Sequence, residues 1–223
     1  MIMKRARAIA LSAAGFAAVV GLATPQIVRR NAPLVRGLPY YADRTLTPYW
    51  LANKGAANAV HRVGDFHLVA SDGRAVSGAD VAGHVYVASF FYSECRTLCP
   101  DLKVQLTRVH DTFAGDTSVM ILSHSVMPER DDPARLAHYA VRNDIDGRQW
   151  KLLTGSRAEL IRLARDAYFV ELADTTGNTR GRLQHTETLV LVDSRGHMRG
   201  VYDGSLAYDV TQLIADIRQL KKS

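Results

Sequence analysis

Cysteine is scarce in this chain: among 223 residues there are only Cys95 and Cys99, four positions apart. Two cysteines cannot build the multiply cross-linked framework of a small secreted domain. They also leave a closed zinc site short of ligands, because such a site takes four side chains and no second Cys or His pair is present. The pair favours a soft metal ion or a reversible disulfide, and the alternatives are a structural disulfide or plain packing in the core.

Acidic residues are nearly absent from the first 62 positions, which hold nine Lys or Arg and only Asp43. The rest of the chain holds 19 basic and 21 acidic residues, so the formal net charge of +6 comes from the leader. A body without a basic excess lacks the electrostatic footprint of nucleic-acid binding. We therefore expect no nucleic-acid partner.

Charged residues are missing from positions 8–24, an Ala-rich stretch of 17 residues that follows Lys4, Arg5 and Arg7. This pattern is typical of an export signal or a short membrane anchor, and the two remain open because a full span needs about 20 residues. We predict that residues 1–25 lead to the membrane and that the remainder lies on the periplasmic side of the cytoplasmic membrane. Residues 26–61 are predicted as an extended connector, and residues 62–223 as one globular domain.

Hydrophobic periodicity predicts an alternation of strands and helices from residue 63 onward. The expected strands lie around Phe66 and Leu68, before a turn at Asp72-Gly73, and at residues 85–91, 119–123, 150–153, 188–192 and 198–202. The expected helices run from Pro100 to Gly115, over 133–143, from a capping box at Ser156 and Glu159, and over 209–220. This order predicts the α/β class, specifically a thioredoxin-like fold with extra N-terminal strands.

The cysteines lie between the apolar run of residues 85–91 and the helix expected at Pro100. The C-x-x-x-C spacing is one residue longer than the redox C-x-x-C, and in a helical turn it places both sulfurs on one face. Because exposed amides and the helix dipole favour a thiolate at a helix start, we expect a lowered pKa for Cys99.

Several longer segments carry a family resemblance. They are 85–91 running into Cys95–Pro100, Leu122–Pro133, Leu152–Gly155, and His185–Asp193 followed by Arg199–Gly204. With them, residues 38 to 220 resemble the SCO/SenC family of thioredoxin-fold copper proteins, which help to assemble the copper centre of cytochrome c oxidase. The resemblance implies Cu(I) or Cu(II) held by Cys95, Cys99 and His185. It also implies a recipient, either the copper-bearing subunit of the oxidase or another copper protein.

One position departs from that resemblance. Met127 stands where the family usually has the acid of Ser-Val-Asp-Pro. Because a thioether is a soft donor, we hypothesise that Met127, together with His124, offers an auxiliary ligand to copper. The alternative is that Met127 is ordinary loop packing.

Three functions compete: a copper metallochaperone, which is not an enzyme, a thiol-disulfide oxidoreductase acting on the cysteines of an oxidase subunit or another exported protein, and a disulfide-stabilised binding domain. Proline is absent after Pro133. Thioredoxin-type enzymes place a cis-proline in the loop that enters the terminal hairpin, and this chain has His185 there instead. The absence favours copper binding without excluding redox chemistry of the pair.

Overall fold

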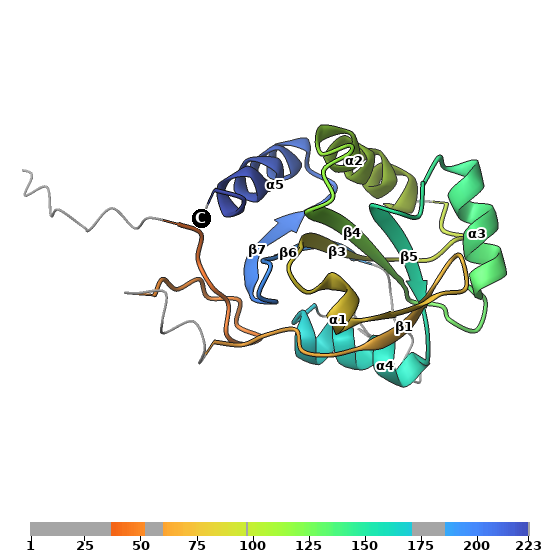
Figure 1. Ribbon diagram of the computed structural model, residues 1–223, viewed down its shortest axis with the longest axis horizontal. Helices are drawn as coiled ribbons and strands as arrows, with labels where there is room; N and C mark the ends of the chain where they lie inside the picture. The colour runs from red at the N-terminus through yellow and green to blue at the C-terminus, as the bar shows by residue number, and fades with distance from the viewer. Residues whose placement is uncertain (1–36, 52–59, 97, 171–185, 223) are drawn as a thin grey trace, which may run out of the picture. The chain divides into compact units, whose positions relative to one another are not determined.

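The computed structural model describes residues 37–51, 60–96, 98–170 and 186–222, all within one compact unit that begins at Val35. A seven-stranded sheet runs through it in the order β2-β1-β5-β4-β3-β6-β7 (Figure 1). The strands are β1 (His67–Ala70), β2 (Ala75–Ser77), β3 (Val85–Phe91), β4 (Val119–Ser125), β5 (Trp150–Thr154), β6 (Thr186–Val192) and β7 (Met198–Asp203).

The centre of the sheet is parallel and its edges are antiparallel. β4 pairs in parallel with β3 and with β5, whereas β6, β7, β1 and β2 pair antiparallel with their neighbours. Every residue of β3 and β4 is buried, which explains why both sequences are nearly continuous apolar runs.

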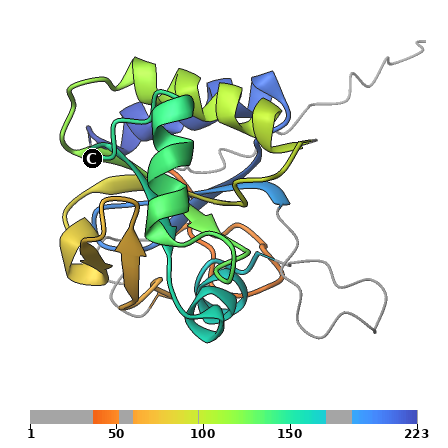
Figure 2. The ribbon, with the colours of Figure 1, turned by 90° about the vertical axis from the view of Figure 1, so that its right-hand side faces the viewer.

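Helices cover both faces of the sheet (Figures 1 and 2). They are α1 (Gly78–Val81), α2 (Leu98–Thr112), α3 (Pro133–Arg142), α4 (Arg157–Arg162), which continues into a π-helical turn (Leu163–Ala167), and α5 (Ala207–Leu220). Buried side chains of α2, α3 and α5 form one core cluster with Val85, Val87 and Phe91. Those of α1, α4 and the π-helical turn form the other, with Tyr86 and Phe90.

The predicted order of strands and helices is confirmed, with differences at several boundaries. α2 begins at Leu98 instead of Pro100, so Cys99 lies inside its first turn. The short helix α1 was not predicted. The capping box at Ser156 is half formed: the Ser156 hydroxyl accepts from the Glu159 amide at 3.2 Å, but the Glu159 carboxylate binds Arg162.

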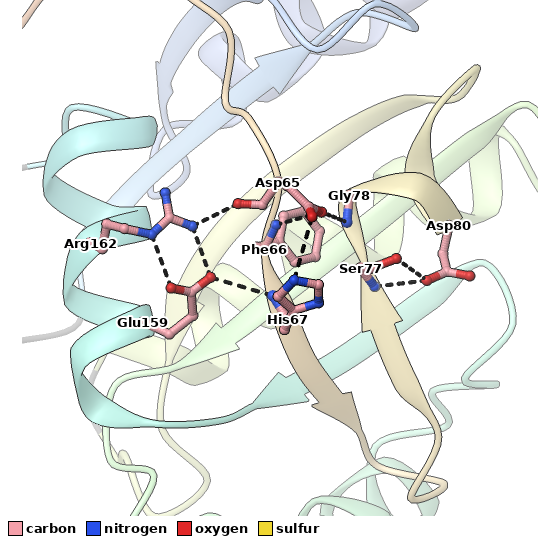
Figure 3. Close-up of polar contacts among 8 residues, drawn as sticks. All are labelled: Asp65, Phe66, His67, Ser77, Gly78, Asp80, Glu159 and Arg162. Carbon is pink, nitrogen blue, oxygen red and sulfur yellow. Dashed lines mark hydrogen bonds and ion pairs between the residues drawn. The ribbon is translucent and has the colours of Figure 1, made fainter.

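The extra N-terminal strands are tied to α4 by polar contacts (Figure 3). Glu159 accepts a hydrogen bond from the backbone N–H of His67 at 3.3 Å, and Arg162 donates to the carbonyl of Asp65 at 2.8 Å. The Asp65 carboxylate accepts in turn from the amide of Gly78 at 3.0 Å. A Cβ at Gly78 would lie 2.8 Å from that carboxylate, so this approach requires glycine.

Part of the predicted connector packs on the domain. Arg199 donates to the carbonyls of Leu38 at 2.6 Å and Pro39 at 2.9 Å, and its guanidinium lies 3.9 Å from the centre of the Tyr40 ring. Asp193 pairs with the same guanidinium at 2.9 Å. The predicted leader, residues 1–25, lies outside the described residues. No helix of the described ranges is long and apolar enough to cross a membrane.

Candidate metal centre

The cysteine pair lies where the central strand β3 gives way to α2. The amide of Cys95 donates to the carbonyl of Tyr92 at 3.2 Å, which turns the chain after Phe91. Cys99 sits in the first turn of α2, and its amide donates to the Cys95 sulfur at 3.4 Å. The two sulfurs are not joined in a disulfide. Both side chains pack with the α2, α3 and α5 cluster, so they share one side of the sheet, although Cys95 precedes the helix and the pair does not lie within one helical turn as the spacing suggested.

The two thiols differ in exposure. Cys99 is 4% exposed, whereas Cys95 is half-buried. Burial raises the pKa of Cys99 to about 12, and the backbone hydrogen bond that opposes this shift is weaker. The expected lowering of the Cys99 pKa is therefore wrong, because desolvation outweighs the helix start. A soft cation that binds here has to displace the proton of the Cys99 thiol.

Two tyrosines line the pair. Burial and then the charge of Cys99 raise the pKa of Tyr139 to about 12. Burial and then the charges of Cys95 and Cys99 also raise the pKa of Tyr92. Their phenol groups therefore stay protonated and neutral at physiological pH beside the sulfurs.

Polar contacts fix the two residues before Cys95. Ser93 donates from its amide and its hydroxyl to Asp131 at 3.1 and 2.5 Å. The Glu94 carboxylate binds Arg130 at 2.9 Å and Arg135 at 2.5 Å. Sequence reasoning did not find this network. The one available signal was that residues 122–133 contain the end of one parallel strand and the segment after it. Parallel neighbours such as β3 and β4 end at the same edge of the sheet, which brings that segment close to the cysteine loop.

The third expected ligand, His185, lies outside the described residues. The next residue, Thr186, opens β6 and pairs with Phe90 of β3. Within the described part of the chain, no three His, Cys, Asp or Glu side chains are grouped to hold a metal ion.

The structure does not bring His124 to the cysteines. Its ring stacks on Phe90 at 5.1 Å and its Nδ1 lies 3.1 Å from the carbonyl of Ser89, on the face of the sheet opposite the pair. The proposed assistance by His124 is therefore wrong, because alternation along β4 directs the side chain away. Met127 is half-buried against that opposite cluster, and its role as a donor stays a prediction.

Comparison with known proteins places this geometry in a family. The SCO1/SenC family model matches residues 54–222. The chain belongs to the SCO1/SenC family. The SCO1 protein homolog of Bacillus subtilis is 27% identical over 160 residues, which are 71% of this chain and 82% of the relative. A mitochondrial SCO2 homolog of Danio rerio is 36% identical over 106 residues, or 46% of this chain and 37% of the relative.

Solved structures confirm the thioredoxin-like fold. BsSco, a member of the Sco family of cytochrome c oxidase assembly proteins with a disulfide switch, is 26% identical with a TM-score of 0.62. The match covers 73% of this chain and 94% of BsSco. Arabidopsis thaliana ScoI, solved with copper bound, is 24% identical with a TM-score of 0.58, over 72% of this chain and 98% of that one.

Proposed function

We propose that this protein is a copper metallochaperone that holds copper through Cys95, Cys99 and His185 and delivers it during assembly of the copper centre of cytochrome c oxidase. The observation that carries the proposal is the adjacency of two sulfurs that are not joined in a disulfide, in the first turn after the central strand. Membership of the SCO1/SenC family and the copper in Arabidopsis thaliana ScoI support it.

The donor set fits copper. Thiolates suit Cu(I), imidazole accepts both oxidation states, and two sulfurs with one imidazole can hold either ion. The half-buried Cys95 can be reached by an ion from solvent, whereas the buried Cys99 is on the inner side of the pair. His185 directly precedes Thr186, which pairs with β3 close to where the cysteine loop begins, and this supports His185 as the third donor.

The location is part of the proposal. A basic start followed by an uncharged apolar stretch supports transport of the domain across the cytoplasmic membrane, or its anchoring there, on the periplasmic side. There it would meet the copper-bearing subunit of the oxidase or another copper protein as recipient.

A titration tests the binding function. The reduced protein is titrated with Cu(I) against a chromophoric chelator, and the titration is repeated after oxidation of the cysteine pair. We expect one copper per reduced chain and none per oxidised chain, because a disulfide offers no thiolate. Failure of the reduced protein to bind copper contradicts the proposal.

A thiol-disulfide oxidoreductase is the second candidate, favoured by the adjacent sulfurs and by the disulfide switch in BsSco. Burial of Cys99 does not exclude it, because exchange requires access to only one sulfur of the pair and Cys95 is half-buried. Rapid exchange of the oxidised pair with glutathione, without copper binding by the reduced protein, is the result that would favour this candidate.

A further inference from the structure

A buried carboxylate lies behind the cysteine loop. We infer that Asp131 is a positioning residue that holds this loop and gives the site a fixed negative charge, which favours Cu(II) over Cu(I). The inference rests on the proposed copper function and deepens it.

Asp131 is 1% exposed, and its two oxygens accept three hydrogen bonds. The donors are the Ser93 amide at 3.1 Å, the Ser93 hydroxyl at 2.5 Å and the Ser125 hydroxyl at 2.7 Å. A backbone N–H can only donate, so the Asp131 oxygen that it contacts is an acceptor. These bonds join the segment before Cys95 to the end of β4 and the turn that follows.

No cation neutralises this carboxylate among the residues that the structure describes. The two nearby guanidinium groups, of Arg130 and Arg135, pair with Glu94 instead. A buried charge is costly unless it is hydrogen-bonded or paired, and the bonds from Ser93 and Ser125 supply only neutral donors. The charge of Asp131 therefore remains available to a cation bound nearby.

Asp131 lies next to the cysteine loop. Both of its oxygens accept hydrogen bonds from Ser93, which lies two residues before Cys95 in the chain. Its third donor, Ser125, ends β4 and pairs with Phe91 at the end of β3, where the cysteine loop begins. A charge at this position acts on a cation held by the cysteines.

The charge of each form of the site gives the direction of the effect. Two thiols that lose two protons on binding Cu(I) leave the site with one net negative charge. The same exchange with Cu(II) leaves it neutral. A fixed negative charge therefore disfavours the Cu(I) form relative to the Cu(II) form. Reduction of the metal-free disulfide by two electrons and two protons starts and ends neutral, so Asp131 should leave that potential unchanged.

The test is Asp131→Asn in the full protein, with Cu(I) and Cu(II) affinities measured by chelator competition. We expect the Cu(II) affinity relative to that for Cu(I) to fall about tenfold, because distance and the protein dielectric weaken the interaction of the carboxylate with the ion. The midpoint potential of the bound copper couple should rise by about 59 mV, the equivalent of tenfold for one electron. The potential of the metal-free disulfide should not move.

Matched variants separate charge from position. Asp132→Asn removes an exposed neighbouring carboxylate whose contact is the Arg135 amide at 2.7 Å, and should leave the affinity ratio unchanged. Ser93→Ala keeps the charge of Asp131 and loosens the loop, so both affinities should fall by the same factor. If Asp131→Asn does not fold, Asp131→Glu is measured instead. This variant retains the negative charge, so its ratio of Cu(II) to Cu(I) affinity must equal that of the unmodified protein.

Three results would overturn the inference: an unchanged ratio in Asp131→Asn, an equal shift in Asp132→Asn, or a tenfold lower ratio in Asp131→Glu. These failures are distinct from failure of the proposed function. If the unmodified protein binds no copper, the function itself is contradicted. If it binds copper and the ratio of Cu(II) to Cu(I) affinity does not depend on Asp131, only the inference is contradicted.

Discussion

The two faces of the sheet carry different donor residues near the ends of β3 and β4. On one face Cys95 and Cys99 pack at the start of α2, and Asp131 binds Ser93 just before them in the chain. On the other, His124 is 0% exposed and its ring packs against those of Phe90 and Tyr168. Residues at one sheet edge therefore need not share a site, because strand alternation decides which face each side chain joins.

The largest effect is expected from the cysteines. Cys95→Ser and Cys99→Ser should each lower the Cu(I) affinity by more than about 100-fold, beyond the range for loss of an outer-shell partner. A hydroxyl is a hard donor that cannot replace a thiolate for this ion. Chelator competition measures the change, and tight binding retained by either variant would remove that cysteine from the site.

On the opposite face, we expect acid to destabilise the fold through His124. Burial lowers its pKa from 6.5 to about 4, so the folded protein favours the neutral ring. The stability that this provides is complete above pH 6.5 and is lost as the pH falls through the window down to about 4. It amounts to about 3 kcal/mol, at 1.36 kcal/mol for each unit of pKa.

Urea unfolding at several pH values measures this effect, with His124→Phe as the variant that cannot titrate. The difference in unfolding free energy between the two proteins should change by about 3 kcal/mol across the window. Copper affinity at pH 7 should be the same in both. Parallel pH profiles of the unfolding free energy in the two proteins would contradict the burial argument. A loss of copper affinity in His124→Phe would indicate that His124 takes part in the copper site.

His185→Ala should weaken Cu(II) binding by roughly 100-fold and Cu(I) binding by roughly tenfold, near the limits seen when metal-site partners are lost. The reason for the inequality is that imidazole contributes proportionately more to the harder ion. Measuring the Cu(I) and Cu(II) affinities of His185→Ala on the same preparation tests this inequality. Equal losses would argue against this division of roles between sulfur and nitrogen.

The smallest effect is expected at Met127. Met127→Leu separates the auxiliary-donor hypothesis from ordinary packing: packing with the cluster on the His124 face predicts a change in Cu(I) affinity of less than about twofold. The same substitution preserves volume, so the fold should be little affected. A tenfold loss of Cu(I) affinity would instead establish the thioether as an auxiliary donor.

The sequence predicts much of the fold because its signals are local. The apolar run 85–91, the Asp72-Gly73 turn and the periodic helix after Pro100 each reflect a short-range pattern. The start of α2 was misplaced by two residues, because a helix boundary depends on local geometry as well as on proline.

The site was less predictable because its determinants are long-range. Ser93 and Asp131 meet across 38 positions, and no periodic pattern records that contact. The sequence also did not predict on which face of the sheet His124 lies, because a strand buried on both sides shows no alternation of polar and apolar residues. The pKa of Cys99 was misjudged for a related reason: a helix start is visible in sequence and the depth of burial is not.

X-ray absorption at the copper edge of the Cu(I)-loaded, reduced protein, with His185→Ala measured beside it, tests whether Cys95, Cys99 and His185 hold the ion. We predict two sulfur neighbours and one imidazole nitrogen, and loss of the imidazole signal in the variant. A third sulfur, or an imidazole signal that persists in His185→Ala and disappears in His124→Phe, would contradict it.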